Sequence, residues 1–327
     1  MPSESLLVLE RVGKRFGDLQ AVEALSFGVR AGEVFGFLGP NGAGKTTTLR
    51  MVMGITRPDQ GQIRFDGSTG LDRSRVGYLP EERGLYADAP VLDMLVYLGE
   101  LRGMRAGDAR QAARSWLERL ELADRASHKV NTLSKGNQQK LQLAGAVLHR
   151  PALAILDEPF SGLDPLNQDL AMRIMRESCA DGTAVLLSAH QLDLVERLAD
   201  RFLLLSRGRE LLGGTLEEVR RAATGGADLV VRVELTPRAG PDLVERAVAA
   251  ALPQARFDRE VLGAGRQALE IAVPAGQDLS PLLAAAAAHA IVHSVDSRRL
   301  PLHELYVRAV ESDRGARCTL ASGSSDG

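Results

Sequence analysis

The sequence has only two cysteines and no surplus of basic residues. Cys179 and Cys318 lie far apart and neither has the spacing of a metal ligand, so we expect two free thiols in a reducing cytosol. The formal net charge is -2, and the basic stripe that is common in proteins bound to DNA or RNA is missing. The composition therefore argues against nucleic acid as a partner.

Long apolar runs are also missing. A membrane-spanning helix needs roughly 18 or more apolar residues, whereas the nearest candidate, Leu282–Val292, is shorter and contains His289. The first residues, Met1–Gly17, include Glu4 and Glu10 and lack the basic start and apolar core of a secretion signal. We expect that any path across a membrane would be formed by another polypeptide.

The 327 residues, 45% of them hydrophobic, are enough for two domains with their own cores. Strands alternate with helices over the first two thirds of the chain, which predicts an α/β fold with a parallel sheet covered by helices. An antiparallel β part is expected near the N-terminus and a helical subdomain at about 82–145. The expected strands are 6–9, 25–29, 33–38, 153–156 and 184–188, with a hairpin at 202–209. The expected helices are 45–54, 137–149, 165–180 and several within 90–128.

A second domain is predicted where this pattern restarts. The small-residue segment Ala222–Ala227 is the expected linker. Beyond it the order βαββαβ with one further helix indicates a ferredoxin-like α+β domain. We therefore expect a first domain over 1–220, an accessory domain over 227–311 and a disordered Ser/Gly/Asp-rich tail over 312–327.

A glycine-rich segment follows the apolar strand 33–38 and precedes a helix. It fits the phosphate-binding loop, Gly, four residues, Gly-Lys-Thr. Glycines allow the backbone N–H groups to turn toward phosphate oxygens, and the helix N-terminus adds its positive end. Lys45 is expected on the β- and γ-phosphates and Thr46 on Mg²⁺. GTPases and small-molecule kinases share this type of loop. In this chain the expected nucleotide-binding residues are Gly39, Pro40, Asn41, Gly42, Ala43, Gly44, Lys45, Thr46 and Thr47.

Two carboxylates end the buried strand 153–156. Asp157 is placed to hold Mg²⁺ through water, and Glu158 is placed to accept a proton from an attacking water or to orient that water. A solvated acidic pair at a strand end is the alternative, which the phosphate loop in the same chain disfavours.

A third motif, Leu133–Lys140, reads Leu-Ser-Lys-Gly-Asn-Gln-Gln-Lys and opens a helix. Here the sequence resembles the ABC ATPase family over about residues 5–215, whose signature is Leu-Ser-Gly-Gly-Gln. Lys135 and Asn137 depart from that signature, whereas Ser134 and Gly136 are kept. The resemblance implies that Ser134, Gly136 and Asn137 serve an ATP held by a partner subunit, at a second helix N-terminus.

Other residues match the family in its order. Phe16 is similar to the aromatic residue that stacks on adenine, although alone it would be taken as core. Asp164 resembles a residue of the loop that crosses the dimer interface. His190 resembles the switch histidine near the γ-phosphate.

Glu81 stands where the family has Gln, after Tyr-Leu-Pro. A carboxylate there can ligate Mg²⁺, and the resemblance implies catalytic and metal-binding roles for it. The run around Glu81 looks like the subgroup of bacterial export ATPases that includes sodium and drug exporters. In that subgroup a small domain follows the ATPase and ends in a segment similar to 300–306.

The resemblance implies an ATP- and Mg²⁺-dependent ATPase that powers a separate transmembrane permease subunit, bound peripherally at the cytoplasmic face of the membrane. Two ATPase subunits, expected to be identical, would close head-to-tail around two nucleotides. The alternatives are a soluble ABC ATPase that remodels ribosomes or DNA and a small-molecule P-loop enzyme, in which Ser134–Gln138 would have no role. The cargo and the role of the accessory domain, dimer support or regulation, stay open.

Overall fold

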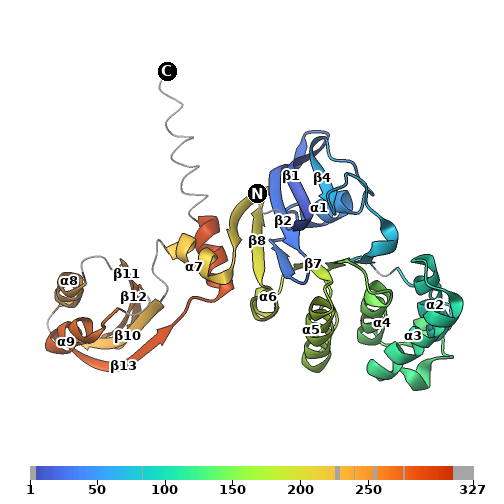
Figure 1. Ribbon diagram of the computed structural model, residues 1–327. Helices are drawn as coiled ribbons and strands as arrows, with labels where there is room; N and C mark the ends of the chain where they lie inside the picture. The colour runs from blue at the N-terminus through green and yellow to red at the C-terminus, as the bar shows by residue number, and fades with distance from the viewer. Residues whose placement is uncertain are drawn as a thin grey trace. The chain divides into compact units, whose positions relative to one another are not determined.

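The computed structural model describes residues 5–82, 84–224, 229–238, 240–252, 256–274 and 277–311. The chain forms two compact units, Met1–Gly213 and Gly214–Gly327 (Figure 1). Helix α7 (Leu216–Thr224) belongs to the second unit, and Arg220 Nε in α7 donates to the carbonyl of Leu300 at 3.0 Å. The expected linker is therefore wrong over 222–224, because these residues continue a helix, and its remainder lies outside the described residues.

The N-terminal sheet is antiparallel and has the strand order β2-β1-β4. Strand β1 (Ser5–Phe16) and strand β2 (Leu19–Arg30) are longer than the apolar runs that predicted them. They continue through register shifts, one of which lies beside Arg11 with its positive φ of 48°. Strand β4 (Gln60–Phe65) was not predicted, since half of its residues are exposed and polar.

A six-stranded sheet forms the centre of the first unit, in the order β5-β6-β7-β3-β8-β9. Helices cover one of its faces, and the antiparallel sheet with one further helix covers the other, which is why β3, β6 and β7 are buried at every residue. All its strand pairs from β5 to β8 are parallel, as the alternation of strands and helices predicted. The strands are β3 (Val34–Leu38), β5 (Val76–Leu79), β6 (Leu153–Asp157), β7 (Ala184–Ala189), β8 (Arg201–Ser206) and β9 (Arg209–Gly214).

The described residues of the first unit form six α-helices and three short 3₁₀ turns. The helices that pack on the sheets are α1 (Lys45–Val52), α4 (Lys135–Val147), α5 (Pro165–Ala180) and α6 (Leu192–Leu198). The helical part between β5 and α4 contains α2 (Val91–Leu101), α3 (Ala106–Arg119), η2 (Ala123–Arg125) and η3 (Val130–Thr132). The turn η1 (Arg73–Arg75) precedes β5. In α3 the buried residues Ala109, Ala113 and Leu117 recur every fourth position. This stripe is the buried side of α3, which packs against α2, while most of its other residues are exposed.

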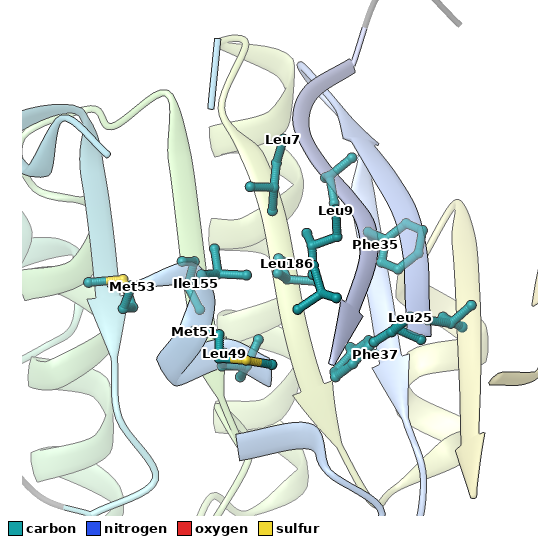
Figure 2. Close-up of a cluster of buried hydrophobic side chains, with 14 of the residues drawn as sticks. Leu7, Leu9, Leu25, Phe35, Phe37, Leu49, Met51, Met53, Ile155 and Leu186 are labelled. Carbon is teal, nitrogen blue, oxygen red and sulfur yellow. The ribbon is translucent and has the colours of Figure 1, made fainter. Parts of the chain in front are cut away.

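The core of the first unit lies between its two sheets and helix α1. Leu7, Leu9 and Leu25 from the antiparallel sheet meet Phe35, Phe37 and Leu186 from the parallel sheet (Figure 2). Leu49 of α1 joins the same cluster and is completely buried. This packing holds both ends of the glycine-rich loop, because β3 leads into it and α1 follows it.

The second unit contains an antiparallel sheet with the order β11-β12-β10-β13. Its elements are β10 (Leu229–Pro237), α8 (Pro241–Ala251), β11 (Arg256–Gly263), β12 (Arg266–Val273), α9 (Ser280–His289), β13 (Ala290–Arg298) and a helix at 302–311. Helices α8 and α9 cover one face through a core that includes Val233, Val244 and Leu282. On the other face Arg232 forms ion pairs with Glu234, Glu260 and Glu270. The expected tail, 312–327, lies outside the described residues.

Candidate functional site

The glycine-rich loop connects β3 to α1 and is packed tightly against neighbouring strands. A side chain at Gly39 would lie 2.6 Å from the carbonyl oxygen of Leu205 in β8. Gly44 has φ +101°, and a Cβ there would approach Ala21 O to 2.5 Å. Only glycine fits at these two positions, so the loop conformation is built into the sequence.

Lys45 begins α1 and is 7% exposed. Its ammonium donates to the carbonyl oxygens of Gly39 at 2.7 Å and Pro40 at 3.4 Å, which holds the charge over the loop. No described side chain caps the N-terminus of α1. The first N–H groups of this helix are thus available to an anion, beside a buried cation.

A cavity of about 620 Å³ opens in front of this loop. It brings together Phe16, most of the loop residues, Glu81 and the two carboxylates Asp157 and Glu158. Four further lining residues, Leu19, Gln20, Ala21 and Arg207, were not predicted from the sequence. The full lining is Phe16, Leu19, Gln20, Ala21, Pro40, Asn41, Gly42, Gly44, Lys45, Thr46, Thr47, Glu81, Asp157, Glu158 and Arg207.

Asp157 ends β6 and is 1% exposed. The hydroxyl of Ser188 in β7 donates to its Oδ1, whereas the buried Oδ2 has no hydrogen-bond partner among the described residues. A free carboxylate oxygen in the same cavity as the Thr46 hydroxyl fits a bound Mg²⁺. The described residues hold no group of three or more His, Cys, Asp or Glu able to bind a metal, so a magnesium ion here would need phosphate oxygens as well.

Glu158 follows directly and has the left-handed φ of 53°. Its N–H donates to the carbonyl of Ser188 at 3.1 Å, which anchors this conformation. Nδ1 of His190 lies 2.8 Å from its Oε2. Burial raises the pKa of Glu158, and the nearby His190 and Lys45 oppose that increase. A carboxylate with a raised pKa and a fixed direction is suited to general-base chemistry.

The signature residues form a separate surface and do not line the cavity. Ser134 is the N-cap of α4, and its hydroxyl accepts from Asn137 N at 3.3 Å. A Cβ at Gly136 would lie 3.2 Å from the carbonyl of Gly162, so this helix start touches the loop before α5. Asp164 caps α5 by accepting from Asn167 N at 2.9 Å. These residues therefore share a second surface.

Two residues that support the carboxylates were missed. Ser188 contacts both Asp157 and Glu158, and Gln139 of α4 donates from Nε2 to the carbonyls of Glu158 at 3.3 Å and Pro159 at 3.1 Å. Gln139 lies within the quoted motif, but its partners are distant in sequence. The position of Ser188 at the end of a buried strand was the only available signal.

Comparisons with known proteins identify the family of the chain. The family model described as "ABC transporter" matches residues 22–161. YhaQ of Bacillus subtilis, an uncharacterized ABC transporter ATP-binding protein, is 43% identical over 219 residues, 66% of this chain and 74% of that protein. The Nod factor export ATP-binding protein I of Burkholderia lata is 41% identical over 208 residues, 62% of this chain and 68% of that protein.

A solved structure of the ATP-binding subunit of an ABC transporter superposes with a TM-score of 0.63. It is 33% identical and covers 67% of this chain and 93% of its own length. The similarity concerns the unit that carries the cavity, and it confirms the resemblance inferred from the motifs. The chain therefore belongs to the ATP-binding, ATP-hydrolysing subunits of ABC transporters.

Proposed function

We propose that this ATPase powers an exporter whose membrane path is formed by a separate permease subunit. The observation that carries the proposal is the single cavity that joins the phosphate loop to Asp157 and Glu158, with His190 at hydrogen-bond distance from Glu158. Export is favoured because several relatives are named as export ATP-binding proteins.

The nucleotide is placed with its base against Phe16 and its phosphates on the loop. Phe16 is 50% exposed at the cavity wall, with the Lys14 ammonium 5.4 Å from its ring centroid and the remaining ring surface available for stacking. Lys45 and the loop N–H groups, including those of Thr46 and Thr47, neutralise the phosphates. Glu158, oriented by His190, accepts the proton of the attacking water.

Asp157, Thr46 and Glu81 are the residues proposed to hold Mg²⁺. The ion would neutralise charge that develops on the phosphate oxygens. The unpartnered Oδ2 of Asp157 supports this assignment. Glu81 is exposed at the rim of the same cavity, where its carboxylate can reach the ion directly or through water.

A second copy of the chain is proposed to complete the site. Ser134, Lys135 and Asp164 are exposed, and the large apolar Leu166 beside them is 83% exposed. Such a surface, with a helix N-terminus that its own cavity does not use, fits the phosphates of a nucleotide bound by the partner. Two chains would thus close head-to-tail around two nucleotides.

The permease is proposed to dock on the helical part near 81–93 from the cytoplasmic face of the membrane. Tyr86 and Tyr97 stand there with ring centroids 5.6 Å apart and with 62% and 43% exposure. Exposed paired aromatics are typical of protein interfaces. No described helix is both long and apolar enough to cross a bilayer.

The second unit is proposed to contain a ferredoxin-like accessory domain over 227–311. The order β-α-β-β-α-β and the strand order β11-β12-β10-β13 support it. Dimer support and regulation are the two roles we consider for it.

Size in solution tests the proposal. Glu158→Gln should block hydrolysis and trap the closed state, so light scattering should show a shift from monomer to dimer upon addition of ATP and Mg²⁺. Replacing Ser134 with Trp in this variant should abolish the shift while ATP binding is retained. A variant that binds ATP but stays monomeric would contradict the homodimer.

The cellular location separates transport from the alternative of ribosome remodelling. Recovery of the chain with membranes that contain its permease would support transport. Sedimentation with ribosomes would support the alternative instead.

A further inference from the structure

Arg207 is a cation at the nucleotide cavity with no ionic partner among the residues that the structure describes. It lies in the turn 207–208 between β8 and β9, far in sequence from the motifs, and it lines the cavity. Among the described residues its side chain forms no hydrogen bond and no ion pair. Its neighbour Arg209 is different, because it pairs with both oxygens of Glu23 at 2.7 Å.

The turn that carries Arg207 is fixed to the phosphate loop. Gly208 N donates to the carbonyl of Ala43 at 2.9 Å, and Gly208 O accepts from Glu23 N at 2.8 Å. A Cβ at Gly208 would lie 2.7 Å from Ala21 O, so the turn presses against β2. Arg207 itself has φ 50°, which these contacts hold in place. The position of the arginine is therefore set by the same loop that receives the phosphates.

These contacts place Arg207 between the two ends of the cavity. On one side Ala21 continues the wall formed by Phe16, Leu19 and Gln20, and on the other side Ala43 belongs to the phosphate loop. The ammonium of Lys45 lies at the opposite end of that loop, 2.7 Å from the carbonyl oxygen of Gly39. In a nucleotide bound between the wall and the loop, the group at the junction is the α-phosphate, which links the ribose to the phosphate chain.

We propose that Arg207 binds the α-phosphate of the nucleotide, as an anchor separate from Lys45. A guanidinium with free N–H groups forms charge-assisted hydrogen bonds to phosphate oxygens. The inference rests on the nucleotide orientation proposed above, with the base at Phe16 and the phosphates on the loop.

Equilibrium titration of the full chain with AMP and with ADP, at low and high KCl, tests the assignment. Arg207→Gln should weaken both nucleotides by the same factor, about tenfold, because both carry the α-phosphate. The loss should shrink at high salt, and Arg207→Lys should retain part of the affinity. Arg114→Gln, the same change at an exposed arginine of α3, should leave both affinities unchanged.

Two results would overturn the assignment of Arg207, and a third would overturn the phosphate placement on which it rests. Unchanged AMP affinity would show that Arg207 does not contact the α-phosphate, whether or not ADP binding weakens. A loss for both nucleotides that is insensitive to salt would indicate a contact with the ribose or base. Lys45→Ala separates the two proposals, since ADP binding as tight as that of the wild type would refute the placement of the phosphates on the loop itself.

Discussion

Nδ1 of His190 lies 2.8 Å from Oε2 of Glu158, across the ends of the neighbouring strands β7 and β6. The Glu158 side chain is 12% exposed and the His190 side chain is 57% exposed, so the histidine covers a largely buried carboxylate from the solvent side. His190 therefore affects both the orientation of the Glu158 carboxylate and its pKa.

We expect His190→Ala to reduce kcat by about a hundredfold while ATP still binds, because the proposed base loses its orienting partner. The pKa of Glu158 is raised by burial and opposed by His190, so removal of the histidine should raise it further. The acid limb of the plot of kcat against pH should then move to higher pH, since Glu158 acts when ionised. An acid limb that stays in place would show that His190 does not act through Glu158.

Ser188→Ala should lower both stability and turnover. The Ser188 hydroxyl donates to Asp157 Oδ1 and faces the N–H of Glu158 at 3.2 Å, so its removal leaves a buried carboxylate oxygen without that donor. The expected loss in the free energy of unfolding is about 1–3 kcal/mol, measured by urea denaturation. Ser178→Ala is the matched control, because that hydroxyl bonds only within α5, to Ile174 O. Equal losses in the two variants would refute the special role of Ser188.

His149 should make the first unit less stable in mild acid. Both its ring nitrogens are buried without a hydrogen-bond partner among the described residues, and burial with nearby Arg102 lowers its pKa to about 4. The unfolded chain binds the proton near pH 6.5, so the stabilisation is complete above that pH and is lost as the pH falls toward 4. After allowance for partial exposure we expect about 1–2 kcal/mol.

Urea denaturation at several pH values measures this effect. His149→Gln should flatten the decline between pH 6.5 and 4, while His128→Gln, at an exposed position, should leave it intact. A decline of the same size in all three proteins would assign the acid sensitivity to other groups.

Gly77→Ala should be among the most destabilising substitutions in the first unit. A Cβ at Gly77 in β5 would lie 1.8 Å from the backbone carbonyl oxygen of Ala146 in α4. Backbone cannot move aside easily, so we expect a loss of about 3 kcal/mol or more, or failure to fold. Gly70→Ala has open space around the new methyl group and serves as the control. The midpoints of thermal unfolding provide the comparison.

Much of the cavity could be predicted because its motifs are local. The loop from Gly39 to Thr46 and the acidic end of β6 each carry their chemistry within a few consecutive residues. Contacts made by the fold could not be predicted in this way. Arg207 reaches the cavity only because β8 lies beside β3, and Ser188 reaches Asp157 only because β7 lies beside β6.

The secondary structure follows the same rule. The strands β3, β6 and β7 are buried throughout and mostly apolar and were predicted, whereas the largely exposed β4 depends on its pairing with β1 and was missed. The small residues Ala222–Thr224 resemble a linker, yet they extend α7, whose Val219 is fully buried. The burial of Val219 earlier in α7 stabilises the helical conformation of these residues.

At Glu158 the residue proposed for hydrolysis is unfavourable for the stability of the fold, because its backbone is left-handed. A glutamate there is disfavoured both by its φ of 53° and by the burial of its charge. Asparagine adopts this conformation more readily and carries no charge. A protein selected only for resistance to heat would therefore tend to lose this glutamate, so an inactive variant that survives heating better than the wild type should be anticipated in any stabilisation screen.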